Sequence, residues 1–356
     1  MLFFTICKLF LVHCSQILTT FVLMKHVYTH IVPLLDNLAD NLPKIFTEEV
    51  IEVACRENPW FSPQDIRYAI GAIKEQFLDT DKVAEWLTAH NICTTDTPLK
   101  VGVIMAGNIP LAGFFDLMCV LSAGHHCYVK PSSKDTALMK ALCEFLCECG
   151  APILPFHECT QPDVLIASGS DATISAIAKE WPDTQLLLRG HRSSVAVLSN
   201  KESEEDLRAL GEDLFRYNSM GCRNVTLVWI PEGYDVEKLV LTLQAAREIV
   251  SPKYVGNYRQ IKATAMLTGE QVIDGGFFVL QHSPTFPTRL AQVNLATYRT
   301  SEDIEAWLTA NDAHIQCVVG THPTALSHPR YAPIGWAQKP TLNDWPDGVD
   351  TLDFLG

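Results

Sequence analysis

The sequence predicts an α/β protein with two lobes, each built on a mostly parallel open sheet, and a helical arm on the N-terminal side. From about residue 100 onward, short apolar runs alternate with segments of helical spacing, and this alternation is typical of parallel sheets. Before residue 90 the apolar residues follow helical spacing alone. The chain has 356 residues, more than twice the ~150 of a typical domain, so it is long enough for two lobes.

The helical arm is predicted over residues 24–97. Within it, Ser62-Pro63-Gln64-Asp65 has the features of a helix start: an N-cap serine, a proline at the first helical position and an acidic third residue. Apolar residues then recur at helical spacing from Ile66 to Phe77. We expect this arm to pack on the first lobe.

A first α/β lobe is predicted over residues 98–200, a second over 201–330 and a C-terminal tail over 331–356. The first lobe is expected to contain strands at 101–105, 127–130, 164–166, 185–188 and 195–198, with helices from residue 110, over 133–149 and over 172–181. The second lobe is expected to begin with a helix over 204–217 and a strand over 225–230. No low-complexity linker separates the lobes, so the cleft between them is the expected active site.

Composition excludes several classes of protein. With 41 acidic and 27 basic side chains the net charge is −14, which repels a polyanion, so no nucleic-acid partner is expected. The 12 cysteines are dispersed along a chain without a clear export signal, which favours reduced thiols and a cytoplasmic enzyme. Neither Cys143, Cys147 and Cys149 nor His125-His126-Cys127 has the spacing of a metal site, so no metal is assigned.

Residues 1–23 are apolar, but Lys8 and His13 interrupt them, and a membrane-spanning helix needs ~20 apolar residues without a break. The interpretation we favour is that Met24 is the true start and that residues 1–23 are an upstream translation artefact. The alternative is a membrane or export role for this segment.

Three predicted strands of the first lobe end in polar or glycine-containing turns that form a candidate nucleotide site. The first strand lacks the usual Gly-x-Gly-x-x-Gly and runs into Ala106-Gly107-Asn108-Ile109-Pro110; the next ends in Lys130-Pro131-Ser132-Ser133, and the third in Ser168-Gly169-Ser170. Lys130 can hold ribose hydroxyls or phosphate, and helices starting at Ser133 and Ser170 can offer backbone N–H groups to a pyrophosphate. The alternative is that these are ordinary turns and helix caps. The candidate cofactor residues are Ala106, Gly107, Lys130, Pro131, Ser132, Ser133, Gly169 and Ser170.

Cys222 is the candidate nucleophile. It lies in Asn218-Ser219-Met220-Gly221-Cys222-Arg223-Asn224, among polar residues and glycine rather than the apolar neighbours of a core cysteine. The adjacent Arg223 can favour the thiolate, which is both a nucleophile and an acyl carrier. The alternative is a cysteine that only begins a strand.

Together these segments resemble the aldehyde dehydrogenase superfamily and, within it, the LuxC-type long-chain acyl-CoA reductases, over roughly residues 55–356. Gly107-Asn108-Ile109-Pro110 is similar to the superfamily loop whose asparagine forms the oxyanion hole, Lys130-Pro131-Ser132-Ser133 to its cofactor motif, and Gly221-Cys222 to its catalytic cysteine. The signs of the subfamily are Asn58-Pro59-Trp60-Phe61, residues 211–224 and Asp347-Gly348-Val349-Asp350. The resemblance implies an aldehyde-dehydrogenase-like fold with Cys222 and Asn108 as catalytic residues.

Two departures from the superfamily pattern shape the functional interpretation. Leu188 stands about 34 residues before Cys222, where aldehyde oxidisers carry the glutamate base that hydrolyses the acyl-enzyme, so hydrolysis is not expected. His191, close by, can replace such a base or be structural. Ser133 replaces the carboxylate that binds the adenosine 2′-hydroxyl of NAD, which leaves room for a 2′-phosphate and implies NADPH.

The resemblance therefore implies an NADPH-dependent enzyme that reduces a fatty acyl-CoA or acyl carrier protein thioester to the aldehyde through an acyl-cysteine. It also allows a partner enzyme that activates the acyl group, and a homo-oligomer. The alternatives are an acyl-phosphate reductase or an aldehyde oxidiser using the same thiol, and an inactive scaffold homologue in which Cys222 is dispensable.

Overall fold

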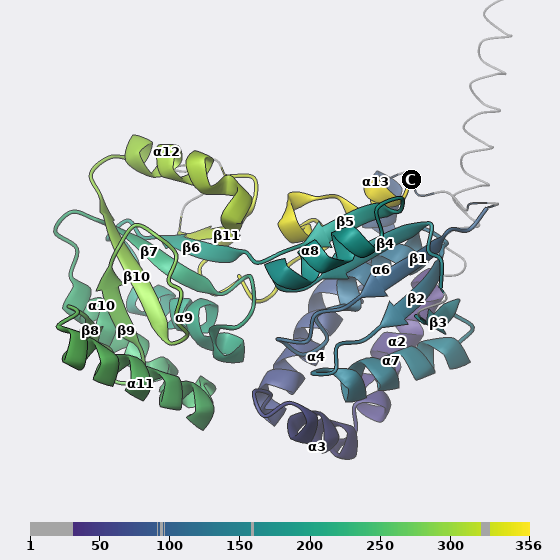
Figure 1. Cartoon of the computed structure of the whole chain (residues 1–356), viewed down its shortest axis with the longest axis horizontal. Coiled ribbons are helices and arrows are strands. Elements are labelled where there is room, and N and C mark those ends of the chain that lie inside the picture. Colours follow the sequence, from purple (N-terminus) through teal and green to yellow (C-terminus); the bar gives the residue numbers. More distant parts are fainter. Residues whose placement is uncertain (1–30, 91, 93–94, 96, 158–159, 322–327) are drawn as a thin grey trace, which may run out of the picture.

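Two mostly parallel sheets, one in each half of the chain, organise the molecule (Figure 1). The computed structural model describes residues 31–90, 92, 95, 97–157, 160–321 and 328–356. The hypothesis about a start at Met24 concerns residues that lie outside this described part. No helix within it is both long and apolar enough to cross a bilayer.

The first sheet has the strand order β3-β2-β1-β4-β5, and all its pairs are parallel. Its strands are β1 (Lys100–Ile104), β2 (His126–Lys130), β3 (Ile153–Pro155), β4 (Val164–Ser168) and β5 (Gln185–Arg189). Helices α6 (Phe114–Ser122) and α7 (Thr136–Glu148) pack with the arm in the large core on one face, whereas α8 (Asp171–Glu180) covers a small cluster on the other. Alternate residues of β4 supply the two faces, as expected of a strand buried on both sides.

The helical arm consists of α2 (Ile31–Ile45), α3 (Glu48–Glu57), α4 (Pro63–Phe77) and α5 (Thr80–Ala89). Ser62 caps α4 as predicted, because its hydroxyl accepts a hydrogen bond from the backbone N–H of Asp65 at 3.0 Å. Apolar residues of α2, α4 and α5 share one core with α6 and α7, so the arm packs on the first sheet.

The second sheet has the order β12-β11-β6-β7-β10-β9-β8 and is parallel except for the pair β8 and β9. Its strands are β6 (Ser193–Val197), β7 (Val225–Pro231), β8 (Ile273–Asp274), β9 (Val279–His282), β10 (Gln292–Tyr298), β11 (Ile315–Gly320) and β12 (Tyr331–Pro333). Helices α9 (Glu204–Phe215), α10 (Val236–Leu243) and α11 (Pro252–Thr268) lie with the larger core of this lobe, and α12 (Ser301–Asn311) lies with the smaller one. The 3₁₀ helices are η1 (Arg216–Ser219), η2 (Gln244–Ile249), η3 (Asp312–His314) and η4 (Pro346–Gly348).

Three predicted boundaries differ from the structure. β6 pairs with β7 and β11, so the chain changes sheets between β5 and β6 and not near residue 200. The helix predicted from Ser133 begins at Thr136, after a turn in which the N–H of Asp135 bonds the carbonyl of Ser132 at 3.0 Å. The helix predicted to Tyr217 ends at Phe215, because Tyr217 has a left-handed backbone with φ of 55°.

The C-terminal segment returns to the first lobe after β12 and ends in α13 (Thr351–Leu355), whose Leu352 and Leu355 join the core shared by the arm and the first sheet (Figure 1). Arg189, at the end of β5, fixes this return. Its guanidinium pairs with the buried Asp116 at 2.9 Å and donates to Thr351 Oγ1 at 2.8 Å and to the carbonyl of Pro346 at 2.6 Å. The tail is therefore an integral part of both lobes.

Candidate active site

Asn108 and the loop of Cys222 meet where the two lobes join. Asn108 follows β1 in the first lobe, and its side-chain amide donates a hydrogen bond to the backbone carbonyl of Met220 in the second lobe at 2.5 Å. Next to Met220, a Cβ on Gly221 would lie 3.4 Å from Ile109 Cγ2. The two segments that the sequence predicts to share a cleft therefore lie in direct contact.

The loop before Cys222 holds three consecutive residues in the left-handed backbone region. Tyr217, Asn218 and Ser219 have φ of 55°, 56° and 57°, and such a conformation costs a non-glycine residue roughly 1–3 kcal/mol. The buried side chain of Asn218 offsets part of this cost, because it donates to the carbonyl of Trp60 at 3.0 Å and accepts from the N–H of Ser251 at 2.8 Å. The loop is thus held in one conformation by the arm on one side and α11 on the other.

Ser194 holds the backbone of Cys222 through its hydroxyl group. Its buried hydroxyl donates to the carbonyl of Cys222 at 3.0 Å and accepts from the backbone N–H of Cys317 at 3.2 Å and from the Cys317 thiol at 3.1 Å. The registers of β6 with β7 and of β6 with β11 both shift beside this residue. Bulges of this kind re-aim neighbouring residues at sheet ends near active sites.

A buried polar network also supports the loop. The Asn224 side chain accepts from the N–H of Gly221 at 2.8 Å and donates to the carbonyl of Arg216 at 2.9 Å. Asp213, which is 0% exposed, accepts from the N–H groups of Gly335 at 2.6 Å and Ala337 at 2.9 Å. Burial raises the pKa of Asp213 to about 7, although these two backbone donors act against the rise.

The thiol of Cys222 has a raised pKa. Although the residue is exposed, the protein atoms packed around its thiol raise the pKa to about 11, and the charge of Asp347 adds to the rise. Arg223 lowers the pKa, as the sequence predicts, but the effect of burial is larger. Arg223 also serves other partners, because its Nε donates to the carbonyl of Ala337 at 2.6 Å and its guanidinium lies 3.7 Å from Asp344. The resting site therefore holds a thiol rather than a thiolate at neutral pH.

The predicted cofactor residues at the ends of β1 and β2 lie against one another. A Cβ on Gly107 would come within 2.5 Å of Ser132 Cβ and Oγ, so only glycine allows these two turns to approach so closely. Lys130, the last residue of β2, and Ser133 are both exposed. Asp135 ties the turns together, because its buried carboxyl group accepts from the N–H of Leu111 at 2.7 Å.

The end of β4 is less open to an anion than the sequence suggests. The Ser170 hydroxyl caps α8 by accepting from the N–H of Thr173 at 3.3 Å, as the helix-cap alternative predicts. Asp171 occupies the first turn of α8, and its carboxylate accepts from the N–H of His191 at 2.8 Å. A pyrophosphate at this helix start would face a negative charge. The start of α8 is therefore a poorer anion site than the sequence suggests.

The segment 188–192, where superfamily members carry a base, has other roles here. Leu188 packs against the small apolar cluster of Leu165, Ala167 and Ile177, toward α8. Arg189 fixes the C-terminal segment as described above, and Arg192 pairs with Asp347 at 3.1 Å. His191 is exposed and is held by its backbone N–H.

Sequence reasoning did not single out Ser194, Asn218, Asn58 or Asp135 as contributors to the site. Each acts through a side-chain contact with a segment far away in sequence, for which a local pattern gives no signal. Two of them lie inside motifs that the sequence analysis quoted: Asn58 begins Asn58-Pro59-Trp60-Phe61, and Asn218 precedes the predicted reactive cysteine. An asparagine there was a hint of unusual backbone, since asparagine tolerates the left-handed region.

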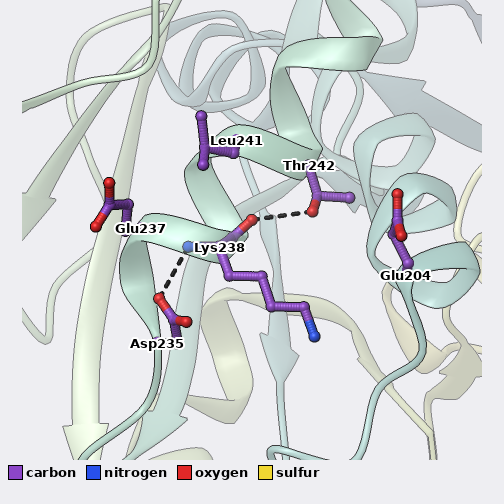
Figure 2. Close-up of a pocket in the computed structure, with 6 residues that line it drawn as sticks. All are labelled: Glu204, Asp235, Glu237, Lys238, Leu241 and Thr242. Carbon is purple, nitrogen blue, oxygen red and sulfur yellow. Dashed lines mark hydrogen bonds between the residues drawn. The ribbon is translucent and has the colours of Figure 1, made fainter.

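A separate recess lies between α9 and α10 (Figure 2). Its polar contacts are local to α10: Asp235 accepts from the N–H of Lys238 at 2.9 Å, and Thr242 Oγ1 donates to the carbonyl of Lys238 at 2.9 Å. These contacts only cap and stabilise α10, so they do not indicate a catalytic or binding role for the recess. Among the described residues, no group of three or more His, Cys, Asp or Glu side chains could hold a metal ion.

Solved structures with this arrangement of lobes are known. An oxidoreductase from Marinobacter aquaeolei matches with a TM-score of 0.64 at 15% identity, over 89% of this chain and 79% of its own. An aldehyde dehydrogenase from Mycobacterium tuberculosis, in complex with NAD+, matches with a TM-score of 0.58 at 15% identity, over 87% of this chain and 77% of its own. The fold is therefore that of the aldehyde dehydrogenases, as the sequence predicts.

Within that class, the chain belongs to the acyl-CoA reductase (LuxC) family, because the family model matches residues 76–266, more than half of its length. A long-chain acyl-protein thioester reductase from Aliivibrio fischeri is 26% identical over 178 residues, which cover 44% of this chain. The match spans only 36% of the length of that relative.

Proposed function

We propose that this chain is a nicotinamide-dependent reductase that converts a fatty acyl thioester to the aldehyde through an acyl group carried on Cys222. The observation that carries the proposal is the hydrogen bond from the Asn108 amide to the carbonyl of Met220. It brings an amide donor from one lobe to within two residues of Cys222 on the other. Membership of the acyl-CoA reductase family supports the same reaction.

The first step is the transfer of the acyl group between thiols. The sulfur of Cys222 attacks the thioester carbonyl, and the second N–H of the Asn108 amide and the backbone N–H of Cys222 stabilise the negative charge on the oxygen. The C–S bond of the substrate then breaks, and the thiol proton leaves with the departing thiol. Because the pKa of Cys222 is raised, its sulfur must give up a proton as it attacks, and that proton leaves on the departing thiol.

The residues proposed to bind the cofactor are Ala106, Gly107, Lys130, Pro131, Ser132 and Ser133. Gly169 and Ser170 are proposed to contribute less, because the charge of Asp171 is adjacent. When bound, the cofactor supplies hydride to the acyl carbon. The chain's own part is to hold the acyl oxygen on Asn108 and then to release the aldehyde, when the bond from carbon to Cys222 Sγ breaks and the sulfur regains a proton from solvent. NADPH is proposed over NADH because exposed Ser133 presents no carboxylate to a 2′-phosphate.

An acyl-CoA or an acyl carrier protein thioester is the proposed substrate, and the relative from Aliivibrio fischeri, named as an acyl-protein thioester reductase, supports a long-chain acyl thioester. The proposed partner is an enzyme that activates the acyl group. The proposed location is the cytoplasm.

The test is to incubate the protein with acyl-CoA labelled in its acyl chain, without reductant, and to map the label. We expect it on Cys222 in the wild type and nowhere in Cys222→Ala, followed by release of aldehyde and free CoA once NADPH is added. Release of phosphate from an acyl phosphate, or formation of the carboxylate from an aldehyde, would favour the two alternative enzymes. Normal aldehyde formation by Cys222→Ala would contradict the proposal.

A further inference from the structure

Asn58 links the arm to the loop that carries Asn108. It is the C-cap residue that follows α3 and is only 4% exposed. Its side-chain amide donates to the carbonyl of Gly107 at 3.3 Å, and its side-chain oxygen accepts from the N–H of Trp60 at 3.1 Å. Its backbone N–H and carbonyl bond Ala54 and Phe61, both at 2.9 Å. All its polar groups are thus used, and the side chain has one orientation.

The same short segment also reaches the loop of Cys222. The carbonyl of Trp60 accepts from the side chain of Asn218 at 3.0 Å, in the left-handed stretch before the cysteine. The Trp60 ring lies 4.5 Å from the ammonium of Lys253 on α11. Residues 58–60 therefore contact the Asn108 loop of the first lobe and the cysteine loop of the second at once.

A buried ion pair fixes the arm against the second lobe close by. Arg216 lies 3.3 Å from Asp65 on α4, and both side chains are less than a twentieth exposed. The guanidinium also lies 4.4 Å above the ring of Tyr68. Because α4 is locked to the cysteine loop in this way, the position of Asn58 relative to that loop is fixed as well.

We propose that Asn58 is a positioning residue for the oxyanion donor. By holding the carbonyl of Gly107, it fixes the peptide unit between Gly107 and Asn108, and so directs the Asn108 amide toward Met220 and the thiol. The role in turnover rests on the proposed function, whereas the bracing of the loop does not. In this arrangement the helical arm braces both loops of the proposed active site.

The variant Asn58→Asp tests this inference. It keeps the acceptor for the N–H of Trp60 but replaces the donor with a carboxylate that faces the carbonyl of Gly107. The matched control is Asn311→Asp on α12, which also removes a side-chain donor to a backbone carbonyl, that of Trp307 at 2.8 Å. Amide hydrogen exchange is measured on both and on the wild type. We expect faster exchange at residues 106–111 in Asn58→Asp alone, and unchanged exchange there would overturn the proposal whatever the protein catalyses.

A double-mutant cycle with Asn108→Ala tests the role in turnover. We expect Asn58→Asp to slow aldehyde formation about tenfold in the wild-type background, and to have almost no effect once Asn108 is alanine, because the group that it positions is gone. Equal slowing in both backgrounds would show that Asn58 acts only on the general fold and would overturn the proposal. If Asn58→Asp does not unfold cooperatively, Asn58→Ala takes its place in both experiments. If the wild type forms no aldehyde, the proposed function fails and the exchange experiment still decides whether Asn58 braces the loop.

Discussion

The side-chain amide of Asn108 donates a hydrogen bond to the carbonyl of Met220, so one of its two N–H groups fixes the orientation of the amide, and the second is the donor that we propose for the acyl oxygen. The contact also joins the lobes at the one place where chemistry is proposed. A donor held in this way needs no reorganisation when the carbonyl oxygen becomes negative, which is the condition under which an oxyanion hole is most effective.

Replacing Asn108 with alanine should slow turnover about 10²- to 10³-fold, the usual effect of losing one oxyanion donor. The loss should appear mainly in kcat, because the donor acts on the charged oxygen more than on the bound thioester. Steady-state rates of aldehyde formation measure this, with Asn311→Ala as the control for loss of an asparagine amide elsewhere. A loss confined to KM would contradict the assignment.

Alkylation of Cys222 by iodoacetamide should become faster with rising pH up to about 11, because the thiolate is the reactive form and burial raises the pKa of this thiol to about 11. Two neighbours should shift the profile in opposite directions. Arg223→Gln removes a charge that lowers the pKa and should slow alkylation at pH 8, whereas Asp347→Asn removes a charge that raises it and should accelerate alkylation.

Because Cys147 and Cys149 are also exposed, the rates must be taken from mass spectrometry of the peptide that contains Cys222. A profile that levels off below pH 8 would show that the pKa of the thiol is not raised, and shifts of the same sign in both variants would show that these two charges do not control it.

Much of the fold could be predicted from the sequence because it depends on local patterns. The cap at Ser62 and the alternation of strands and helices are of this kind, and the resemblance added the pairing of Asn108 with Cys222. The prediction that the strand at 195–198, now β6, belongs to the first sheet was wrong, because a run buried on both faces does not indicate which strands it pairs with. The left-handed run at 217–219 was missed because its cost is offset by contacts from residues distant in sequence, such as Trp60.

Ser133→Glu should shift cofactor preference from NADPH toward NADH. A carboxylate at this exposed position can accept from a ribose 2′-hydroxyl and repels a 2′-phosphate. Ser133→Gln is the matched control, because it has the size of glutamate without its charge and should change the preference less. The ratio of kcat/KM for the two cofactors measures the effect. A wild type that uses NADH as well as or better than NADPH would refute the argument.

The buried carboxyl of Asp135 should make the protein less stable as the pH rises from about 4 to about 8. The side chain is 1% exposed, and one oxygen accepts from the N–H of Leu111 at 2.7 Å, while the other has no partner among the described residues. Burial raises its pKa to about 8, with the charge of Glu57 adding to the rise and the N–H of Leu111 opposing it. An unfolded aspartate has a pKa near ~3.9.

Between these two pKa values the folded protein holds a proton that the unfolded chain releases. The stabilisation from this bound proton is therefore fully present below pH ~4 and is lost as the pH rises toward 8. Over this range the free energy of unfolding falls by up to about 1.4 kcal/mol per pH unit. Asp135→Asn cannot ionise, and its amide oxygen can still accept from Leu111, so its free energy of unfolding should fall less between pH 5 and pH 8. Urea unfolding at the two pH values measures the difference, with Asp81→Asn on α5 as the exposed control. If Asp135→Asn loses as much stability as the wild type over this range, the carboxyl of Asp135 is not protonated in the folded protein at pH 5, and the loop that carries Asn108 is held to an ionised group instead.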